Sequence, residues 1–214
     1  MDALRADDLI GLFQRWRDMF AAQREFLIAL DGKVGDSDLG ITMAKSFAAA
    51  ADTVTAEGAA AGITKLLRSA GAIMAKTAPS TMGTLTATGF LRGAKALEGV
   101  EVIGTAELAQ FWRAFATGIA ERGKAKLGDK TILDVLDPVA GALEQAASSG
   151  LALAPALKMA ADAADAALEK TKTMVAQHGK AAAFQEKTVG LQDAGATVGV
   201  LLVQTMSDVV AGPA

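Results

Sequence analysis

The sequence predicts an all-α fold, and three observations lead to that prediction. Apolar residues make up 51% of the 214 residues, and most of them are alanine and leucine, which favour helices. Tyrosine is absent and runs of β-branched residues are few, which argues against strands. Apolar side chains recur three and four residues apart, the spacing that lines one face of an α-helix.

The first predicted helix covers residues 6–29. Leu9, Phe13, Trp16 and Phe20 follow one another at intervals of four, three and four residues, so they share one face. This helix is expected to end where a loop rich in glycine and aspartate begins.

Seven further segments show the same spacing, and glycine-containing junctions separate them. The predicted helices cover residues 40–55, 63–76, 84–97, 105–122, 131–147, 154–177 and 189–210. The chain contains no repeat of fixed period and no linker rich in proline, glycine and serine. We therefore expect a single domain over residues 1–214.

Composition also excludes several classes of protein. The net charge is −3 and the pI is near 5.2, with lysine and arginine dispersed, which argues against a nucleic-acid surface. Cysteine is absent, so the chain forms no disulfide or thiolate metal site. The amino terminus carries charges where a signal peptide has its apolar core, and the longest apolar run, residues 198–203, is too short to cross a bilayer. We expect a cytoplasmic protein with no membrane partner.

The segment from Leu30 to Phe47 concentrates negative charge. Asp31, Asp36 and Asp38 fall within eight residues and are separated by glycines. Carboxylates this close repel one another unless a cation or hydrogen-bond donors offset their charge. Carboxylate oxygens suit Mg²⁺, Mn²⁺ or Ca²⁺, and Mg²⁺ commonly takes further ligands from phosphate. The segment therefore predicts a site for a divalent cation.

Two alternatives to that metal site follow from the spacing. An EF-hand calcium loop needs a bidentate glutamate at its twelfth position, but that position is Thr42 or Phe47, depending on the starting aspartate. In the second alternative, Asp31 and Asp36 end a loop and Asp38 caps the next helix. Spacing alone leaves this second alternative open.

Hydroxyl groups gather at the start of the predicted helix 84–97. Ser80, Thr81 and Thr84 surround Gly83, so hydroxyls and free backbone N–H groups can face an anion there. The same hydroxyls can equally serve as ordinary helix caps.

Two later segments, residues 122–134 and 179–199, contain glycine-bounded turns with lysine, aspartate and threonine before a helix. Such turns can hold a phosphate or an adenine, and they can equally be plain connections between helices.

Taken in order, these segments resemble the nucleotide-binding L subunit of the bacterial dihydroxyacetone kinases, which is equivalent to the carboxy-terminal domain of the single-chain kinases. The aspartate loop matches the family pattern GDxDxG at residues 35–40, GDKT occupies residues 128–131, and QDAGAT at residues 192–197 is similar to the family's QDPGAT. The similarity covers nearly the whole chain. It implies an antiparallel barrel of eight amphipathic helices with ADP or ATP bound at one end.

The resemblance also implies roles for individual residues. Asp31, Asp36 and Asp38 would bind two Mg²⁺ ions that bridge the phosphates of the nucleotide. The positions implied to bind the nucleotide are Gly40, Thr42, Ser80, Thr81, Gly83, Gly123, Thr131, Ile132, Lys180, Asp193 and Gly195. No side chain is implied as a nucleophile. A separate K-type subunit would hold the hydroxyketone through its own histidine, and in one form of the family a phosphocarrier subunit rephosphorylates bound ADP.

The chain departs from the family pattern at several positions. Leu39 replaces a histidine, Lys180 replaces an arginine, and Leu191 and Ala194 interrupt the family's GHQDPG motif. Residues 79–85 read PSTMGTL where the family has GGxSGPL. Lysine keeps the positive charge of arginine but cannot make its planar bidentate contact.

Three functions therefore compete. The first is a nucleotide-carrying phosphotransferase subunit that acts on dihydroxyacetone or a related ketose. The second is a non-catalytic nucleotide-binding subunit that docks onto a partner and regulates it. The third is a helical bundle whose acidic loop binds nothing. The intact aspartates favour the first.

Overall fold

The computed structural model describes residues 1–212 and confirms the predicted all-α class. Within that range the chain forms nine α-helices and two 3₁₀-helices and has no strand. The elements are α1 (Ala6–Ala22), α2 (Arg24–Asp31), α3 (Leu39–Glu57), η1 (Ala59–Ala61), α4 (Ile63–Thr77), α5 (Thr81–Ala96), α6 (Thr105–Gly123), α7 (Leu133–Ser148), α8 (Leu153–Thr171), η2 (Lys180–Thr188) and α9 (Ala194–Ala211).

Three predicted helices were wrong in extent. The helix predicted over residues 6–29 is interrupted at Gln23, a turn residue with φ −87° and ψ 3°, so that α2 forms a separate short helix. The helix predicted over residues 154–177 ends at Thr171, and the one predicted over residues 189–210 begins only at Ala194. The segment between these last two helices instead contains η2 and forms part of the pocket described below.

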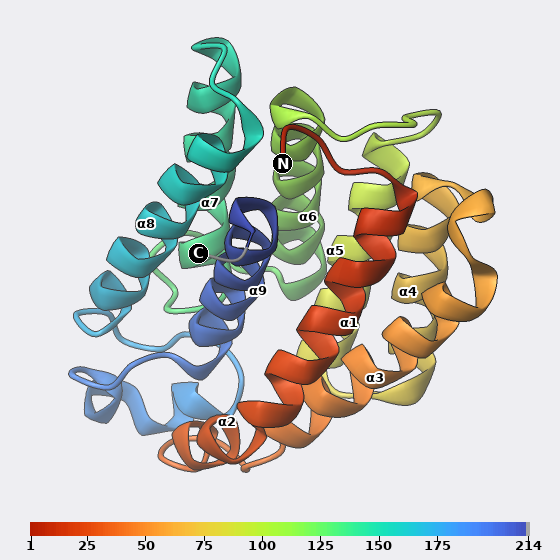
Figure 1. The fold of residues 1–214 in the computed structure, drawn as a ribbon. Helices are drawn as coiled ribbons and strands as arrows, with labels where there is room; N and C mark the ends of the chain where they lie inside the picture. The colour runs from red at the N-terminus through yellow and green to blue at the C-terminus, as the bar shows by residue number, and fades with distance from the viewer. Residues whose placement is uncertain (213–214) are drawn as a thin grey trace.

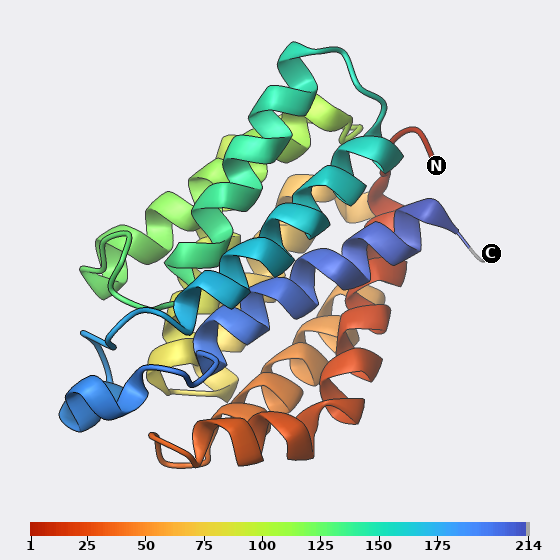
Figure 2. The same ribbon diagram turned by 90° about the vertical axis from the view of Figure 1, so that its left-hand side faces the viewer.

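The long helices pack against one another largely in chain order (Figures 1 and 2). From α3 to α9 each α-helix contacts the next, and α1 contacts both α3 and α9. The helix α2 packs on α3, where the Cα of Gly40 lies so close to the Arg24 carbonyl oxygen that a Cβ would overlap it. Both α2 and η2 lie at the lower end of the molecule in both views.

An aromatic cluster forms the centre of the core, and Phe90 of α5 lies at its middle. The Phe90 ring centroid lies 5.2–6.1 Å from those of five neighbouring rings. The fully or almost fully buried members are Phe13, Trp16, Phe20, Phe47, Phe90, Phe111, Trp112 and Phe115. They come from α1, α3, α5 and α6, so the cluster joins these four helices at the centre of the core.

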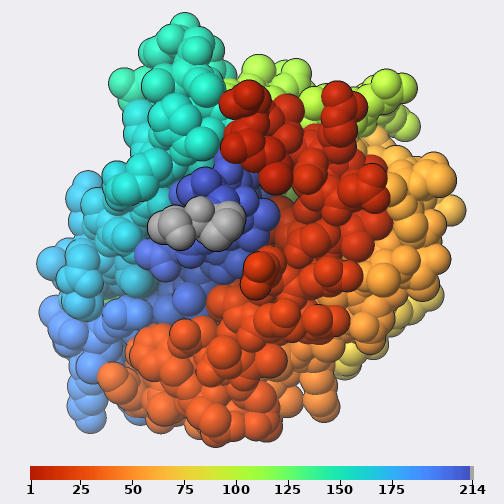
Figure 3. Space-filling view, in the orientation of Figure 1, coloured from red at the N-terminus to blue at the C-terminus, as the bar shows by residue number. Residues whose placement is uncertain are grey.

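The last helix, α9, lies between α1 and α8 on the face shown in Figure 3. Its Leu202 carbonyl accepts a hydrogen bond of 3.0 Å from the buried Trp16 indole N–H. By length and composition alone α9 could cross a membrane, contrary to the expectation from the shorter run at residues 198–203, but 56% of it is buried inside the protein. Core helices of globular proteins pass the same test.

The close approach of α5 to α6 gives a first prediction. A Cβ on Gly89 would lie 2.6 Å from three carbon atoms of the Phe115 ring, whereas a Cβ on Gly11 of α1 would meet nothing within 4 Å. Gly89→Ala should therefore lower the free energy of unfolding by about 1–3 kcal/mol through overpacking. Gly11→Ala should raise it by about 0.5–1 kcal/mol, because alanine is the better helix former.

Urea denaturation measures both changes. Equal effects of the two substitutions would show that α5 and α6 are not packed as closely as described.

Candidate functional site

A pocket of about 350 Å³ opens at the end of the molecule that carries α2 and η2. Five chain segments that are distant in the sequence form its walls. They are the aspartate loop after α2, the start of α5, the connection before α7, residues 178–181, and residues 191–195. The pocket therefore brings together all the segments that the sequence singled out.

The three aspartates lie on one wall of this pocket. Asp31, Asp36 and Asp38 each offer one carboxylate oxygen, and these oxygens lie within 4.8 Å of one another. Among the described residues no other group of three acidic or histidine side chains brings its ligand atoms this close. Gly35 keeps the loop compact, because a Cβ there would overlap the Asp31 carboxylate.

The aspartates have different local partners. Asp31, the last residue of α2, accepts hydrogen bonds at Oδ2 from the N–H groups of Asp38 at 3.1 Å and Leu39 at 3.4 Å, so it caps α3. Asp38 occupies the N-cap position of α3, but its own side chain makes no capping bond. The alternative in which the Asp38 side chain caps α3 was therefore wrong, because the Asp38 carboxylate accepts no hydrogen bond from the first turn of that helix.

Lysine provides positive charge on this side of the pocket. The Lys180 ammonium at the start of η2 pairs with Asp36, and this hydrogen bond holds the pKa of Asp36 below its usual value. Partial burial raises the pKa of Asp38, and the charges of Asp36 and Asp31 add to that rise. A divalent cation would relieve the repulsion that Asp38 experiences, and the all-oxygen donor set fits a hard ion such as Mg²⁺.

The hydroxyl segment combines both roles that its sequence allowed. The Ser80 hydroxyl oxygen accepts a hydrogen bond of 3.0 Å from the Gly83 N–H, so Ser80 is the N-cap of α5. Ser80 and Thr81 nevertheless both line the pocket, and the exposed Thr81 lies in the first turn of the helix. The first turn of α5 can therefore present hydroxyl and N–H donors to an anion.

Lys130, in the connection before α7, joins two walls of the pocket. It is only 4% exposed, and its Nζ donates to the carbonyl oxygens of Thr171 at 2.8 Å, Met174 at 3.3 Å, Thr188 at 2.7 Å and Leu191 at 2.7 Å. An ammonium has three N–H donors, so the four carbonyls share them. Lys130 thus holds both ends of the segment 172–192 against the GDKT turn.

These four hydrogen bonds, called the Lys130 clamp below, explain why α8 is shorter than predicted. In a longer helix the carbonyls of Thr171 and Met174 would accept from N–H groups one turn further along the chain. Instead, the Thr171 carbonyl accepts from the Met174 N–H in a tight turn at 3.1 Å and from the Lys130 ammonium, and the Met174 carbonyl accepts from the Lys130 ammonium. The sequence marked the GDKT turn as a site candidate but gave no sign that Lys130 points inward to backbone.

Asp193 forms the opposite wall and caps α9. Its Oδ2 accepts a hydrogen bond of 2.7 Å from the Ala196 N–H. Desolvation raises the pKa of Asp193 to about 6, although the Ala196 N–H and the Lys130 charge act in the other direction. Gly195 follows in the first turn, where a Cβ would lie 2.9 Å from the Met82 methyl group.

The residues expected to bind a ligand divide into two groups. The structure brings ten of them to the pocket wall: Asp31, Asp36, Asp38, Ser80, Thr81, Thr131, Ile132, Lys180, Asp193 and Gly195. Gly40, Thr42, Gly83 and Gly123 are not among its lining residues.

The glycines outside the lining have packing roles. A Cβ on Gly40 would overlap the Arg24 carbonyl oxygen, a Cβ on Gly83 would overlap the Ala78 carbonyl oxygen, and a Cβ on Gly123 would lie 3.3 Å from Leu85. Thr42 is 7% exposed within α3. These four residues therefore do not line the pocket. Lys130 and His178 do line it, although they were not predicted as site residues.

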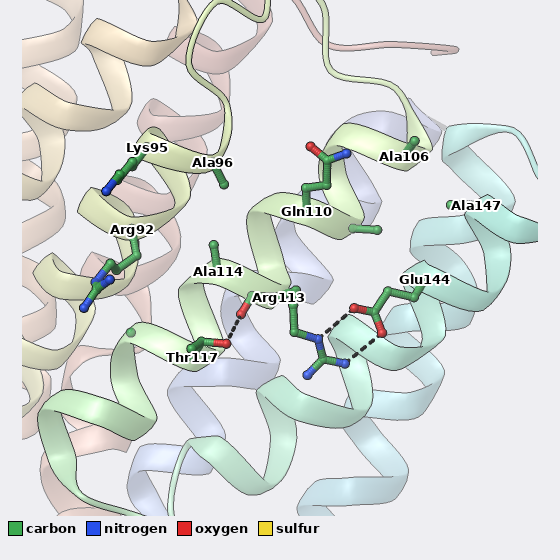
Figure 4. A pocket seen from close by; sticks show the side chains of 12 residues that line it. Arg92, Lys95, Ala96, Ala106, Gln110, Arg113, Ala114, Thr117, Glu144 and Ala147 are labelled. Atoms are coloured by element: carbon green, nitrogen blue, oxygen red, sulfur yellow. Dashed lines mark hydrogen bonds and ion pairs between the residues drawn. The ribbon is translucent and has the colours of Figure 1, made fainter.

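A larger groove of about 750 Å³ lies on the outer face between α5, α6 and α7 (Figure 4). Alanines form much of its floor, and its Arg113 guanidinium is already bound by Glu144 and Asp137. Arg92 at its edge is likewise paired with Glu121. The groove offers no cluster of acidic ligands, so we assign the function to the smaller pocket.

The chain is similar to several known proteins. Residues 33–208 match the family model described as DAK2 domain. The chain is 32% identical over 205 residues to the "PEP-dependent dihydroxyacetone kinase, ADP-binding subunit DhaL" of Escherichia coli, with 96% of this chain and 97% of that protein covered. It is 31% identical over 194 residues to the "L-erythrulose kinase" of Pectobacterium atrosepticum, covering 90% of this chain and 33% of that protein.

Solved structures share the fold. The native dihydroxyacetone kinase of C. freundii superimposes with a TM-score of 0.74 at 23% identity, covering 97% of this chain and 35% of that one. The same kinase in complex with AMP-PNP and Mg²⁺ gives a TM-score of 0.70. This chain thus spans about a third of the length of that kinase.

The Lys130 clamp predicts a local loss of order when it is removed. Lys130→Met removes the ammonium donor from four carbonyls. Those of Thr171 and Thr188 keep a backbone N–H partner, but those of Met174 and Leu191 do not, so the free energy of unfolding should fall by about 2–4 kcal/mol. Amide hydrogens in residues 172–192 should exchange faster, as hydrogen exchange mass spectrometry would show. Lys172→Met is the control, because Lys172 pairs only with Glu169 at the surface. Equal protection of this segment in both variants would contradict the clamp.

The raised pKa of Asp193 predicts a pH-dependent stability. A folded-state pKa of about 6 against an ordinary value of 3.8 means that the native state binds the proton more tightly, so stability falls as the pH rises between these values. Asp193→Asn keeps a capping side chain and removes this loss. Its free energy of unfolding should exceed that of the unsubstituted protein by about 2–3 kcal/mol at pH 8, and by almost nothing at pH 4.

Urea denaturation across this pH range measures that difference. Asp208→Asn, on the exposed side of α9, is the control and should change little. A difference between the Asp193 variant and the unsubstituted protein that is independent of pH would contradict the assigned environment of Asp193.

Proposed function

The chain belongs to the DAK2 domain family, and from this premise we propose that it is the ADP- or ATP- and Mg²⁺-binding subunit of a dihydroxyacetone kinase-like system. In this proposal it transfers phosphate to a small hydroxyketone or ketose held on a separate K-type subunit. The observation that carries the proposal is the convergence of three carboxylates, an anion-facing helix start and the Lys180 ammonium on one pocket.

Asp31, Asp36 and Asp38 would hold the metal, and we propose two ions, as in the resemblance described above. Metal ions bound there would neutralise the phosphate oxygens and fix the direction of transfer. The protein's own contribution is positional. Ser80 and Thr81 lie at the start of α5 and can present donors, and Lys180 supplies a cation next to Asp36. No side-chain nucleophile is needed for such a transfer.

The remaining contacts would bind the rest of the nucleotide. We propose direct contacts from Thr131, Ile132, Asp193 and Gly195, because these residues line the pocket. Gly40, Thr42, Gly83 and Gly123 would act indirectly by fixing the backbone. In the proposed architecture the eight long helices form a closed antiparallel barrel in one domain, with the nucleotide at the end that carries α2 and η2.

The acceptor would come from another polypeptide. The relatives named dihydroxyacetone kinase subunits match this chain over nearly their full length, whereas the chain covers only 33% of the L-erythrulose kinase. We propose that a K-type partner supplies the ketose and that a phosphocarrier subunit can restore bound ADP to ATP, as the names of PEP-dependent relatives suggest. These steps would take place in the cytoplasm.

A second candidate function is regulatory. Leu39 occupies the position at which the dihydroxyacetone kinase family has a histidine. It is 5% exposed and adds no polar group to the pocket. A subunit that binds the nucleotide but transfers no phosphate would use the same pocket to signal nucleotide status to a partner. Phosphorylation of a ketose in the presence of a K-type subunit would exclude this candidate.

The metal assignment predicts a ligand-dependent melting temperature. A ligand at about 100 times its Kd stabilises the native state by roughly 2.7 kcal/mol, so ADP with Mg²⁺ should raise the Tm by roughly 5–11 °C. Asp36→Asn should abolish most of this rise because it removes a metal ligand. Asp52→Asn is the control, since Asp52 is exposed on α3 outside the pocket. An equal rise with ADP and EDTA would overturn the proposed metal-dependent site.

A further inference from the structure

His178 contributes a ring to the pocket that the proposed function does not yet use. It is the sole histidine of the chain, and it lines the pocket together with Gly179, Lys180 and Ala181. The helix predicted over residues 154–177 would have placed it just past a helix end. Instead, α8 ends seven residues earlier, at Thr171, and the histidine side chain is 36% exposed.

A carboxylate holds the imidazole in place. His178 Nε2 lies 2.8 Å from Asp129 Oδ2, and the Asp129 side chain is 16% exposed. The same Oδ2 accepts a hydrogen bond of 2.8 Å from the Lys126 N–H. The neighbouring backbones are also joined, because the Gln177 N–H donates to the Asp129 carbonyl at 3.0 Å. The side-chain contact of His178 and the backbone hydrogen bond of Gln177, both with Asp129, thus fix the position of the ring.

The environment of Asp129 defines which ring nitrogen is free. The Lys126 N–H lowers the pKa of Asp129, and the hydrogen bond to His178 lowers it further, so Asp129 is a carboxylate near neutral pH. A carboxylate accepts, and therefore Nε2 must carry the proton that it donates. Nδ1 remains available to a ligand, and it becomes a donor when the ring is protonated.

The other charges around the pocket define what this donor would meet. Asp31, Asp36, Asp38 and Asp193 supply negative charge, and the proposed metal would engage the first three. Of the cations, Lys130 is used by four carbonyls and Lys180 is paired with Asp36. Lys126, near Asp129, lies outside the lining. A bound diphosphate would bring further negative charge to a pocket with few uncommitted cations.

We propose that His178, positioned by Asp129, donates from Nδ1 to an anionic phosphate oxygen of the bound nucleotide. His178 is then a second ligand-binding residue next to Lys180, and Asp129 is a positioning residue that orients the ring. This inference rests on the proposed nucleotide site and adds to it a contact whose strength depends on pH, because histidine changes its charge between pH 5 and 8.

Titration calorimetry with ADP and Mg²⁺ at pH 6.0 and 8.5 tests the contact. His178→Gln keeps a neutral hydrogen-bonding side chain but cannot become a cation. The unsubstituted protein should bind about tenfold more tightly than this variant at pH 6.0 and less than about twofold more tightly at pH 8.5. Comparing the two proteins at the same pH cancels the titration of the nucleotide and of the other pocket groups.

Two further variants separate the roles of the pair. Asp129→Asn should also weaken binding at pH 6.0, because the ring loses the carboxylate that orients Nδ1 toward the ligand. Gln177→Ala is the matched control, since this neighbouring side chain bonds only to the Val175 carbonyl and does not line the pocket. Its affinity should equal that of the unsubstituted protein at both pH values. In ¹⁵N NMR of the imidazole, addition of ADP and Mg²⁺ should move the Nδ1 resonance of His178.

These measurements test the His178 contact separately from the proposed nucleotide site. If the unsubstituted protein binds ADP with Mg²⁺ but the His178→Gln variant binds equally well at pH 6.0, the inference is wrong and the proposed function stands. A loss of affinity of the same size at both pH values also overturns the charged contact. If the unsubstituted protein binds no ADP, the proposed function and this inference both fall.

Discussion

The Lys130 ammonium connects the turn before α7 to both ends of the segment between α8 and α9, and the geometry of the pocket depends on that connection. Its buried Nζ donates to four carbonyls. Those of Thr171 and Thr188 also accept a backbone N–H, whereas those of Met174 and Leu191 depend on the ammonium alone. Without it, these carbonyls would need water or a different backbone course. Asp193 at the start of α9 and Lys180 at the start of η2 both lie on this segment or next to it, so their positions follow from the clamp.

A second constraint is the balance of charge across the pocket. Three carboxylates lie on one wall, and only Asp31 is engaged by backbone donors. Lys180 reaches across from η2 to Asp36, a residue 144 positions away in the sequence. A bound metal would compete with Lys180 for Asp36 and free its ammonium for an anionic ligand. In the proposed function, the binding of metal and the binding of an anionic ligand would therefore be coupled through one ion pair.

Much of this arrangement could be predicted from the sequence. The features that could not be predicted depend largely on contacts between residues that are far apart in the chain. Apolar spacing predicted the helical class and most helix positions, because each signal lies within one or two turns. The aspartate cluster was visible for the same reason. The break at Gln23 and the early end of α8 were missed. The latter depends on Lys130 contacting residues 41–61 positions away, and the placement of His178 depends on Asp129, 49 positions away. Such contacts leave no periodic signal.

In the proposed function, Asp31, Asp36 and Asp38 hold metal ions against the phosphates of a nucleotide at the end of the helical bundle. Anomalous diffraction from crystals grown with ADP and Mn²⁺ tests it most directly, because Mn²⁺ takes the same oxygen ligands as Mg²⁺ and can be located individually. The account predicts strong peaks about 2 Å from carboxylate oxygens of these three residues, each also in contact with a phosphate oxygen. Bound ADP with no Mn²⁺ at the aspartates, or Mn²⁺ bound elsewhere, would contradict it.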